Sequence, residues 1–88
     1  EALAVSPVAP NPVRGQGTLT MTVRETQPVQ VTLYDALGRR VRTLYDSELQ
    51  AQQPQPLQVE AATLASGTYF LRVQGETAQQ TTRFVVVR

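Results

Sequence analysis

The side chains that could carry chemistry in this chain are carboxylates, hydroxyls and arginines. The seven Asp and Glu residues are scattered mainly at turn-like positions, whereas a glycosidase needs two carboxyls facing each other across a cleft of roughly 5–10 Å. Ser6, Ser47 and Ser66 have no histidine in the chain to act as their general base. The run Asp46–Glu48 offers oxygens to Ca²⁺ but has fewer ligands than a dedicated calcium loop. The residues therefore indicate no catalytic centre, no metal or cofactor site and no small-molecule substrate.

Composition narrows the class of protein further. The chain has 88 residues, which fits one domain. Its net charge of +1 gives no field strong enough to predict binding to nucleic acid or to an anionic membrane. It contains no Cys and no His, so disulfides, thiolate metal sites and the commonest general base are excluded. The start at Glu1 rather than Met leads us to expect a module cut from a longer protein.

Alternation of apolar and polar residues predicts β-strands along most of the chain. Residues 18–23 and 29–34 alternate clearly, and the next segment, Asp35–Gly38, predicts a tight turn in which Gly38 takes a positive φ. In the run 39–45, Val41 points inward, while Leu44 breaks the parity and requires a bulge. The fold class predicted from this pattern is all-β, an immunoglobulin-like antiparallel β-sandwich of about seven short strands.

The inward-facing positions of these strands form the predicted core. They are Leu19, Met21, Val29, Val31, Leu33, Val41, Leu57, Leu71, Val73, Phe84 and Val86. Gly67 is expected to supply a positive φ at the entry to a strand, and Tyr69 to bury its ring while its hydroxyl reaches a backbone group. The run Phe84–Val87 lacks alternation, which indicates burial on both faces of the strand or an interface.

Two groups of polar or aromatic residues each allow two interpretations. Tyr34 and Tyr45 could stack on a sugar, but no Trp stands beside them, and cross-strand packing explains them better. Arg39, Arg40 and Arg42 form a small basic cluster. The cluster is either a solvated edge that discourages sheet-to-sheet pairing or a docking patch for an acidic partner.

Four short motifs in order give the chain a resemblance to a known family, over Val8 to Arg88. They are Pro10-Asn11-Pro12, Tyr34-Asp35-Ala36-Leu37-Gly38-Arg39, the spaced set Leu64, Gly67 and Tyr69, and an apolar strand bracketed by Arg83 and Arg88. With these motifs the chain resembles the type A C-terminal sorting domain of the type IX secretion system (Por secretion) of Bacteroidetes-like bacteria. It departs from the family at Ala9, where an aromatic residue is frequent, and at its terminal Arg, where Lys is common.

The resemblance implies a trafficking role. Residues 1–88 would form a single C-terminal sorting domain, with residues 1–7 as a linker or first edge strand. It would direct a larger exported protein through the periplasm and the outer-membrane translocon to the cell surface or the extracellular space. The expected partners are the type IX translocon and a sortase-like peptidase, which would cleave before or around Ala2–Pro7, where no core residue would be disturbed. The domain itself would not be an enzyme.

The resemblance also assigns sorting residues: Pro10, Asn11, Pro12, Gly38, Arg39, Gly67, Tyr69, Arg83 and Arg88. Recognition would use edge strands and the terminal hairpin, because an edge strand exposes unpaired N–H and C=O groups that a receptor strand can extend. Arg83 and Arg88 would fix the register against carboxylates.

Two alternatives belong to other classes. An accessory carbohydrate-binding sandwich of a secreted glycoside hydrolase would show a row of exposed aromatics or a Ca²⁺ site. A plain immunoglobulin-like spacer would tolerate changes at its C-terminus and could stand anywhere in the parent protein.

Overall fold

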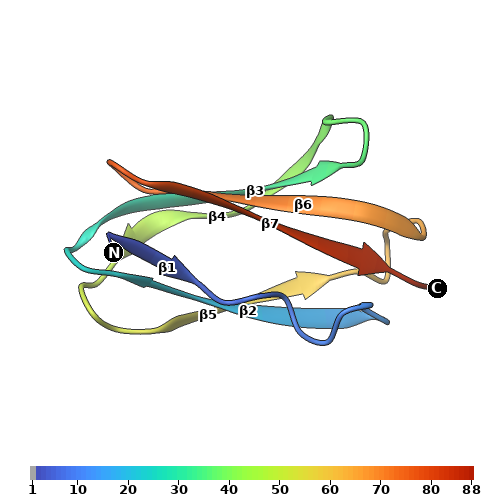
Figure 1. Ribbon diagram of the computed structural model, residues 1–88, viewed down its shortest axis with the longest axis horizontal. Coiled ribbons are helices and arrows are strands. Elements are labelled where there is room, and N and C mark those ends of the chain that lie inside the picture. Colours follow the sequence, from blue (N-terminus) through green and yellow to red (C-terminus); the bar gives the residue numbers. More distant parts are fainter. Residues whose placement is uncertain (1) are drawn as a thin grey trace.

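The computed structural model describes residues 2–88, which form seven strands and their connections. The strands make two antiparallel sheets that face each other as a sandwich (Figure 1), which confirms the predicted fold class. The strands are β1 (Leu3–Val5), β2 (Gln16–Val23), β3 (Gln27–Asp35), β4 (Arg40–Leu49), β5 (Gln55–Glu60), β6 (Gly67–Gln74) and β7 (Gln79–Val86). No helix in the described part of the chain is long and apolar enough to cross a membrane.

The two sheets differ in size. One has three strands in the order β1-β2-β5, and the other has four in the order β4-β3-β6-β7. Neighbouring strands run antiparallel throughout both sheets. The last strand, β7, therefore lies at an edge of the larger sheet, beside β6.

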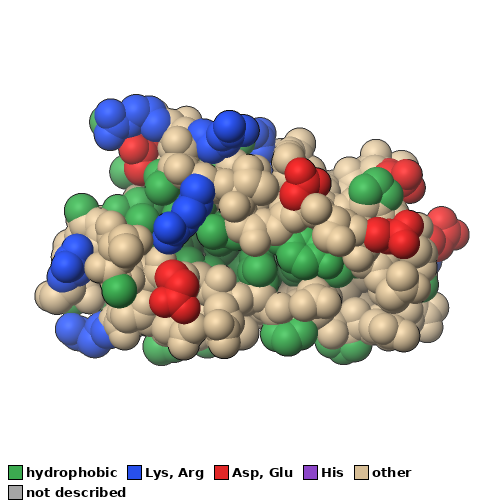
Figure 2. Space-filling model, turned by 180° about the vertical axis from the view of Figure 1, so that it is seen from behind, with side chains coloured by type: hydrophobic (Ala, Val, Ile, Leu, Met, Phe, Trp, Pro, Cys, Tyr) green, Lys and Arg blue, Asp and Glu red, His purple; other side chains and the backbone are tan. Residues whose placement is uncertain are grey.

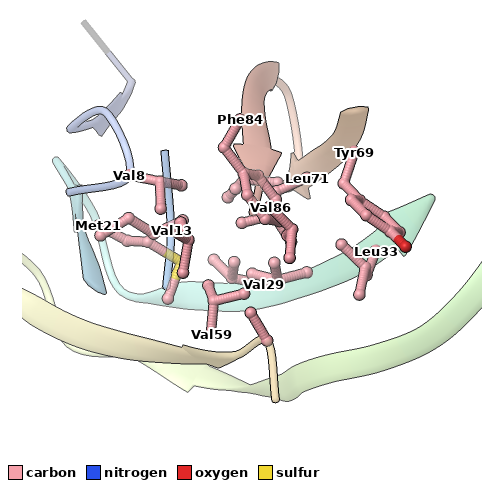
Figure 3. Packing of buried hydrophobic residues seen from close by; sticks show 14 of the residues in the cluster. Val8, Val13, Met21, Val29, Leu33, Val59, Tyr69, Leu71, Phe84 and Val86 are labelled. Carbon is pink, nitrogen blue, oxygen red and sulfur yellow. The ribbon is translucent and has the colours of Figure 1, made fainter. Parts of the chain in front are cut away.

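The core lies between the sheets, because alternation turns one face of each strand inward. Apolar side chains from both sheets meet there, as Figure 3 shows. The predicted core residues that are buried are Leu19, Met21, Val29, Val31, Leu33, Leu71, Val73, Phe84 and Val86. Leu57 is half-buried and packs against the cluster, whereas Val41 is 40% exposed.

The prediction for Val41 was wrong because β4 carries two irregularities rather than one. The register with β3 shifts between Val31 and Thr32, which leaves Leu44 without a partner, as the parity break predicted. It shifts again between Leu33 and Tyr34, where Val41 is skipped. An extra residue in one strand loses its ladder partner and bends the strand, so Val41 does not point into the core.

The connection between β1 and β2 adds core residues that the alternation pattern missed. Val8 and Val13 are 2% and 0% exposed, and both point inward beside Met21 (Figure 3). Gly17 lets them approach β2, because a Cβ at this position would lie 2.9 Å from Val8 Cγ1 and 3.1 Å from Val13 Cγ2. The other buried apolar residues outside the predicted core are Leu3, Val23, Leu49, Val59, Ala61, Leu64 and Tyr69.

The N-terminal residues that the structure describes belong to the sandwich. Leu3–Val5 pairs with β2 as the edge strand β1, and Leu3 is 2% exposed. Cleavage within Ala2–Pro7 would therefore disturb the core, contrary to the expectation from the sequence. Glu1 lies outside the described residues.

Candidate functional site

The four motifs found in the sequence meet at one end of the sandwich. This end, called the motif end below, is formed by the Pro10–Gly15 segment, the β3–β4 turn, the β5–β6 connection and the last residues of β7 (Figure 1). All nine residues that the resemblance assigned to sorting lie at this end or in the adjoining parts of strands β6 and β7. The structure thus gathers residues that are far apart in the sequence.

The segment Pro10–Val13, called the strap below, lies along the free edge of β7. Val13 N donates a hydrogen bond to Val85 O (2.7 Å), and Val87 N donates one to Val13 O (3.0 Å). Asn11 adds a side-chain contact, because its Oδ1 accepts a hydrogen bond from Val85 N at 3.0 Å. The first and last motifs of the sequence are therefore in direct contact.

This contact corrects the expected open edge. Val85 and Val87 direct backbone groups away from β6, and the strap pairs with them. Strand alternation places the outward groups of Thr81 and Arg83 on the same edge. Among residues 2–88, β7 pairs only with β6 and, at its end, with the strap. The open part of the edge is thus the short stretch at Thr81 and Arg83, not the terminal residues.

Tyr69 fixes the other side of the terminal hairpin. Its ring is stacked on Phe84 with centroids 5.9 Å apart, and its hydroxyl donates to Ala65 O at 2.8 Å. Both observations confirm the predicted buried ring and backbone contact. Immunoglobulin-like sandwiches place a tyrosine in the same way at this corner. Gly67 has a φ of +154° with no atom near the position of a Cβ, so backbone conformation, not crowding, favours glycine there.

Arg88 is held in place by the β5–β6 connection. Its backbone N donates to Ser66 Oγ at 3.0 Å, and its Nη1 donates to Leu64 O at 3.1 Å. Arg83 is exposed. The two arginines that bracket the terminal strand therefore differ: Arg88 anchors the chain, and Arg83 faces solvent. The Ser66 contact could not be predicted from the sequence, because it joins the chain end to the β5–β6 connection, 22 positions away.

The β3–β4 turn is organised by Asp35. Its Oδ1 accepts hydrogen bonds from Leu37 N (2.9 Å) and Arg39 N (3.0 Å), and its Oδ2 pairs with Arg39 Nε at 2.9 Å. The bond from the Arg39 backbone N–H, helped by the Arg39 guanidinium and Leu37 N–H, lowers the pKa of the Asp35 carboxyl below its usual 3.8. Gly38 has a φ of +82°, as predicted. Leu37 at the tip is 78% exposed.

Charge separates the two ends of the sandwich. Six of the eight arginines lie in the half nearer the motif end: Arg14, Arg39, Arg40, Arg42, Arg83 and Arg88. Arg72 lies near the middle of the sheet, and its guanidinium contacts Tyr34. Asp35 and Glu60 lie in the same half, while the other described carboxylates lie toward the opposite end. On the face shown in Figure 2, most acidic side chains gather at the end away from the basic ones. The molecule is 37 Å long, several times the Debye length of about 8 Å at physiological ionic strength. A partner at the motif end therefore meets the field of the arginines.

The two tyrosines and the acidic run considered as possible ligand-binding residues in the sequence all lie in strands. Tyr34 lies opposite Phe70 and Tyr45 opposite Val31, so each takes part in cross-strand packing. The Asp46–Glu48 run lies in β4, and within residues 2–88 no group of three potential ligands could hold a metal ion.

The comparison with protein families agrees with the motifs. The model of a family described as the secretion system C-terminal sorting domain matches residues 7–87, nearly the whole chain. Among curated proteins no relative matches this chain.

Proposed function

Because this chain belongs to the secretion system C-terminal sorting domain family, we propose that the motif end is the surface by which the type IX secretion machinery recognises it. Family membership fixes the broader role. The domain is a C-terminal sorting signal for type IX secretion, acts as part of a larger secreted protein, and leads it to the cell surface or the extracellular space.

The convergence of the motifs is the observation that carries this proposal. Four segments that are far apart in the sequence form one surface. They are the strap, the β3–β4 turn, the start of β6 around Tyr69 and the end of β7. Most arginines of the chain surround that surface. Charged groups grouped on one side of a protein speed and orient its encounter with a partner of opposite charge.

The finer steps of the role follow from the same proposal. The domain passes through the periplasm already folded and acts by binding, without a reaction of its own. A sortase-like peptidase then separates it from its cargo on the N-terminal side of β1. We place the cut before Leu3 because removal of this buried residue, which lies on the strand paired with β2, would open the core between the two sheets.

The proposal is tested with a reporter protein fused to the N-terminus of the domain in a bacterium that has the type IX system. The wild-type domain should bring the reporter to the cell surface, where added protease digests it. Arg83→Glu combined with Arg88→Glu should lower surface delivery at least tenfold, since it reverses charge at the motif end. Arg24→Glu, which changes the arginine at the opposite end, is the matched control and should act as wild type.

Because Arg88 also anchors the chain, each single variant and its circular dichroism spectrum are needed. Arg83→Glu alone should keep the wild-type spectrum and still lower delivery. Equal surface delivery by the wild-type domain and by Arg83→Glu would show that this arginine is only a solvated strand residue. Retention of the wild-type reporter inside the cell would refute the sorting role for this chain.

A further inference from the structure

The four-stranded sheet has an outer face, made of the side chains that point away from the core, and it is not uniform. Across β3 and β6, Tyr34 and Phe70 lie opposite each other on this face, and both are half-buried. Val85 and Val87 of the terminal segment are half-buried as well, while Phe84 and Val86 fill the core. The Phe84–Val87 run is thus fully buried only on the face that carries Phe84 and Val86. Of the two explanations for its lack of alternation, burial on both faces or an interface, the interface remains for the face that carries Val85 and Val87.

Arginines flank the two rings on both sides. Arg40 of β4 lies opposite Tyr34, and Arg83 of β7 lies opposite Phe70. Because residues paired across neighbouring strands share a face, Arg40, Tyr34, Phe70 and Arg83 form one row across all four strands. Both arginines are exposed. Aromatic residues and arginine are the types enriched where protein partners meet.

Arg72 stands beside this row and completes the site. Its Cζ lies 4.8 Å from the centroid of the Tyr34 ring, and its guanidinium donates a hydrogen bond to the Tyr34 hydroxyl. Its Nε is buried and has no hydrogen-bond partner among the described residues. An open hollow of about 350 Å³ is lined by Tyr34, Gly38, Phe70, Arg72 and Thr81, none of which is acidic.

The other half of the same face carries the opposite charge. Asp46 lies opposite Gln30 and Glu48 opposite Pro28, toward the end of β4 that is remote from the motif end, and both carboxylates are exposed. An acidic surface on a partner is attracted to the half of the face that carries the arginines and repelled by the half that carries Asp46 and Glu48. Such an arrangement selects one orientation of the partner.

We propose that this arginine–aromatic face is a docking surface for a protein partner that presents Asp or Glu beside an apolar side chain. The apolar side chain would enter the hollow between Tyr34 and Phe70, and the carboxylates would bind Arg40 and Arg83. This inference rests on the proposed function, since the partner is expected in the type IX machinery, and it names the chemistry of that partner.

An anionic glycan or lipid headgroup would also attract arginines, but the aromatic geometry favours a protein. A sugar binds by stacking on an open ring face, and the Arg72 guanidinium already lies over the ring of Tyr34. Phe70 is half-buried between its neighbours on β3 and β7, so most of its ring is covered and it offers no open platform for a sugar.

Photocrosslinking in the exporting cell tests this inference. Thr81 lines the hollow and is exposed, so it is replaced by photoreactive benzoyl-phenylalanine in the reporter fusion. Thr18, which is exposed on the outer side of the smaller sheet, receives the same replacement as the control. Illumination should give a protein adduct from Thr81 only, and mass spectrometry should locate it in a peptide with at least two Asp or Glu residues.

Second-site changes show which chemistry holds the partner. In the Thr81 variant, Arg40→Glu or Phe70→Thr should lower the adduct yield about tenfold with an unchanged circular dichroism spectrum, whereas Arg24→Glu should leave it unchanged. Export of the reporter without an adduct from Thr81 would overturn this inference while the sorting role stands. An adduct to a glycan or lipid, or to a peptide without carboxylates, would also overturn it. If the unsubstituted reporter is not exported at all, the sorting role itself has failed.

Discussion

The two ends of the sandwich are closed by different means. At the motif end, the strap adds main-chain hydrogen bonds to β7, and the Tyr69–Phe84 stack fills the interior. At the opposite end, an uncharged side chain joins two turns. Gln27 is 7% exposed, donates to Glu25 O at 3.0 Å and accepts from Glu76 N at 2.8 Å. Each end is thus closed without the help of Arg40, Arg72 or Arg83.

The two ends also differ in charge, and the way in which each end of the core is closed does not explain this difference. The only salt bridge within the described residues, Asp35 with Arg39, leaves the other arginines of the motif end without a paired carboxylate. Like charges gathered in one place repel one another and lower the stability of the fold. A partner with carboxylates removes that repulsion. The opposite end thus serves the fold, whereas the motif end serves the fold and also carries the unpaired arginines on which the proposed recognition depends.

The largest difference in the free energy of unfolding is expected within the motif end itself, between variants of two phenylalanines. Phe84 is fully buried and stacked on Tyr69, whereas Phe70 is half-buried on the outer face. Phe84→Ala should lower the free energy of unfolding by about 3–5 kcal/mol. Phe70→Ala should lower it by only about 1–2 kcal/mol, because less apolar surface is lost. Urea denaturation of the purified domain measures both values.

Equal losses for the two variants would contradict the distinction between an inner face that holds the fold and an outer face that contributes little to stability. Leu49→Ala, a change of a buried residue toward the opposite end, serves as a further reference and should cost about 2–5 kcal/mol.

A smaller effect compares the polar contacts of the two ends. Gln27→Ala removes two hydrogen bonds of a buried side chain and should cost about 2–3 kcal/mol, while Asn11→Ala removes one bond at the surface and should cost about 1 kcal/mol. Amide hydrogen exchange locates each loss. Asn11→Ala should speed exchange at Val85 and leave Glu76 unchanged, and Gln27→Ala should do the reverse. Faster exchange at both amides in either variant would mean that the ends do not act independently.

The smallest effect concerns the pH dependence of the β3–β4 turn. The folded-state pKa of Asp35 is lowered, so its contribution to stability is present above the unfolded pKa of about 3.8 and is lost as the pH falls through the lower folded value. The wild-type melting temperature should thus fall by a small extra amount below about pH 3.8. Asp35→Asn should lack this extra fall. Parallel melting curves of the two proteins at low pH would show that the Asp35 contacts do not stabilise the turn.

The strands and most of the core followed from the sequence because alternation is a local property. Leu19 and Met21 on β2, or Val29 and Val31 on β3, face the core by the period of the strand alone. The prediction that Val41 is buried failed because the second shift of register in β4 depends on the pairing of this strand with β3. This second bulge, unlike the one at Leu44, leaves no mark in the spacing of apolar residues.

The candidate site followed from the sequence only in part. Motif resemblance named its residues, and turn chemistry gave the roles of Gly38 and Asp35. The contact of the strap with β7 could not be read from the sequence, because it joins Asn11 to Val85, 74 positions apart. Val8 and Val13 were missed for a related reason: their segment crosses between the sheets and has no strand period.

The bond between Asn11 and Val85 also makes the motif end a test of an intact chain. Contacts between distant positions form late in folding, because a long loop must close before they add stability. A polypeptide that stops before β7, or is still unfolded there, cannot assemble this surface. A receptor that binds the assembled surface would therefore not bind unfinished or unfolded molecules.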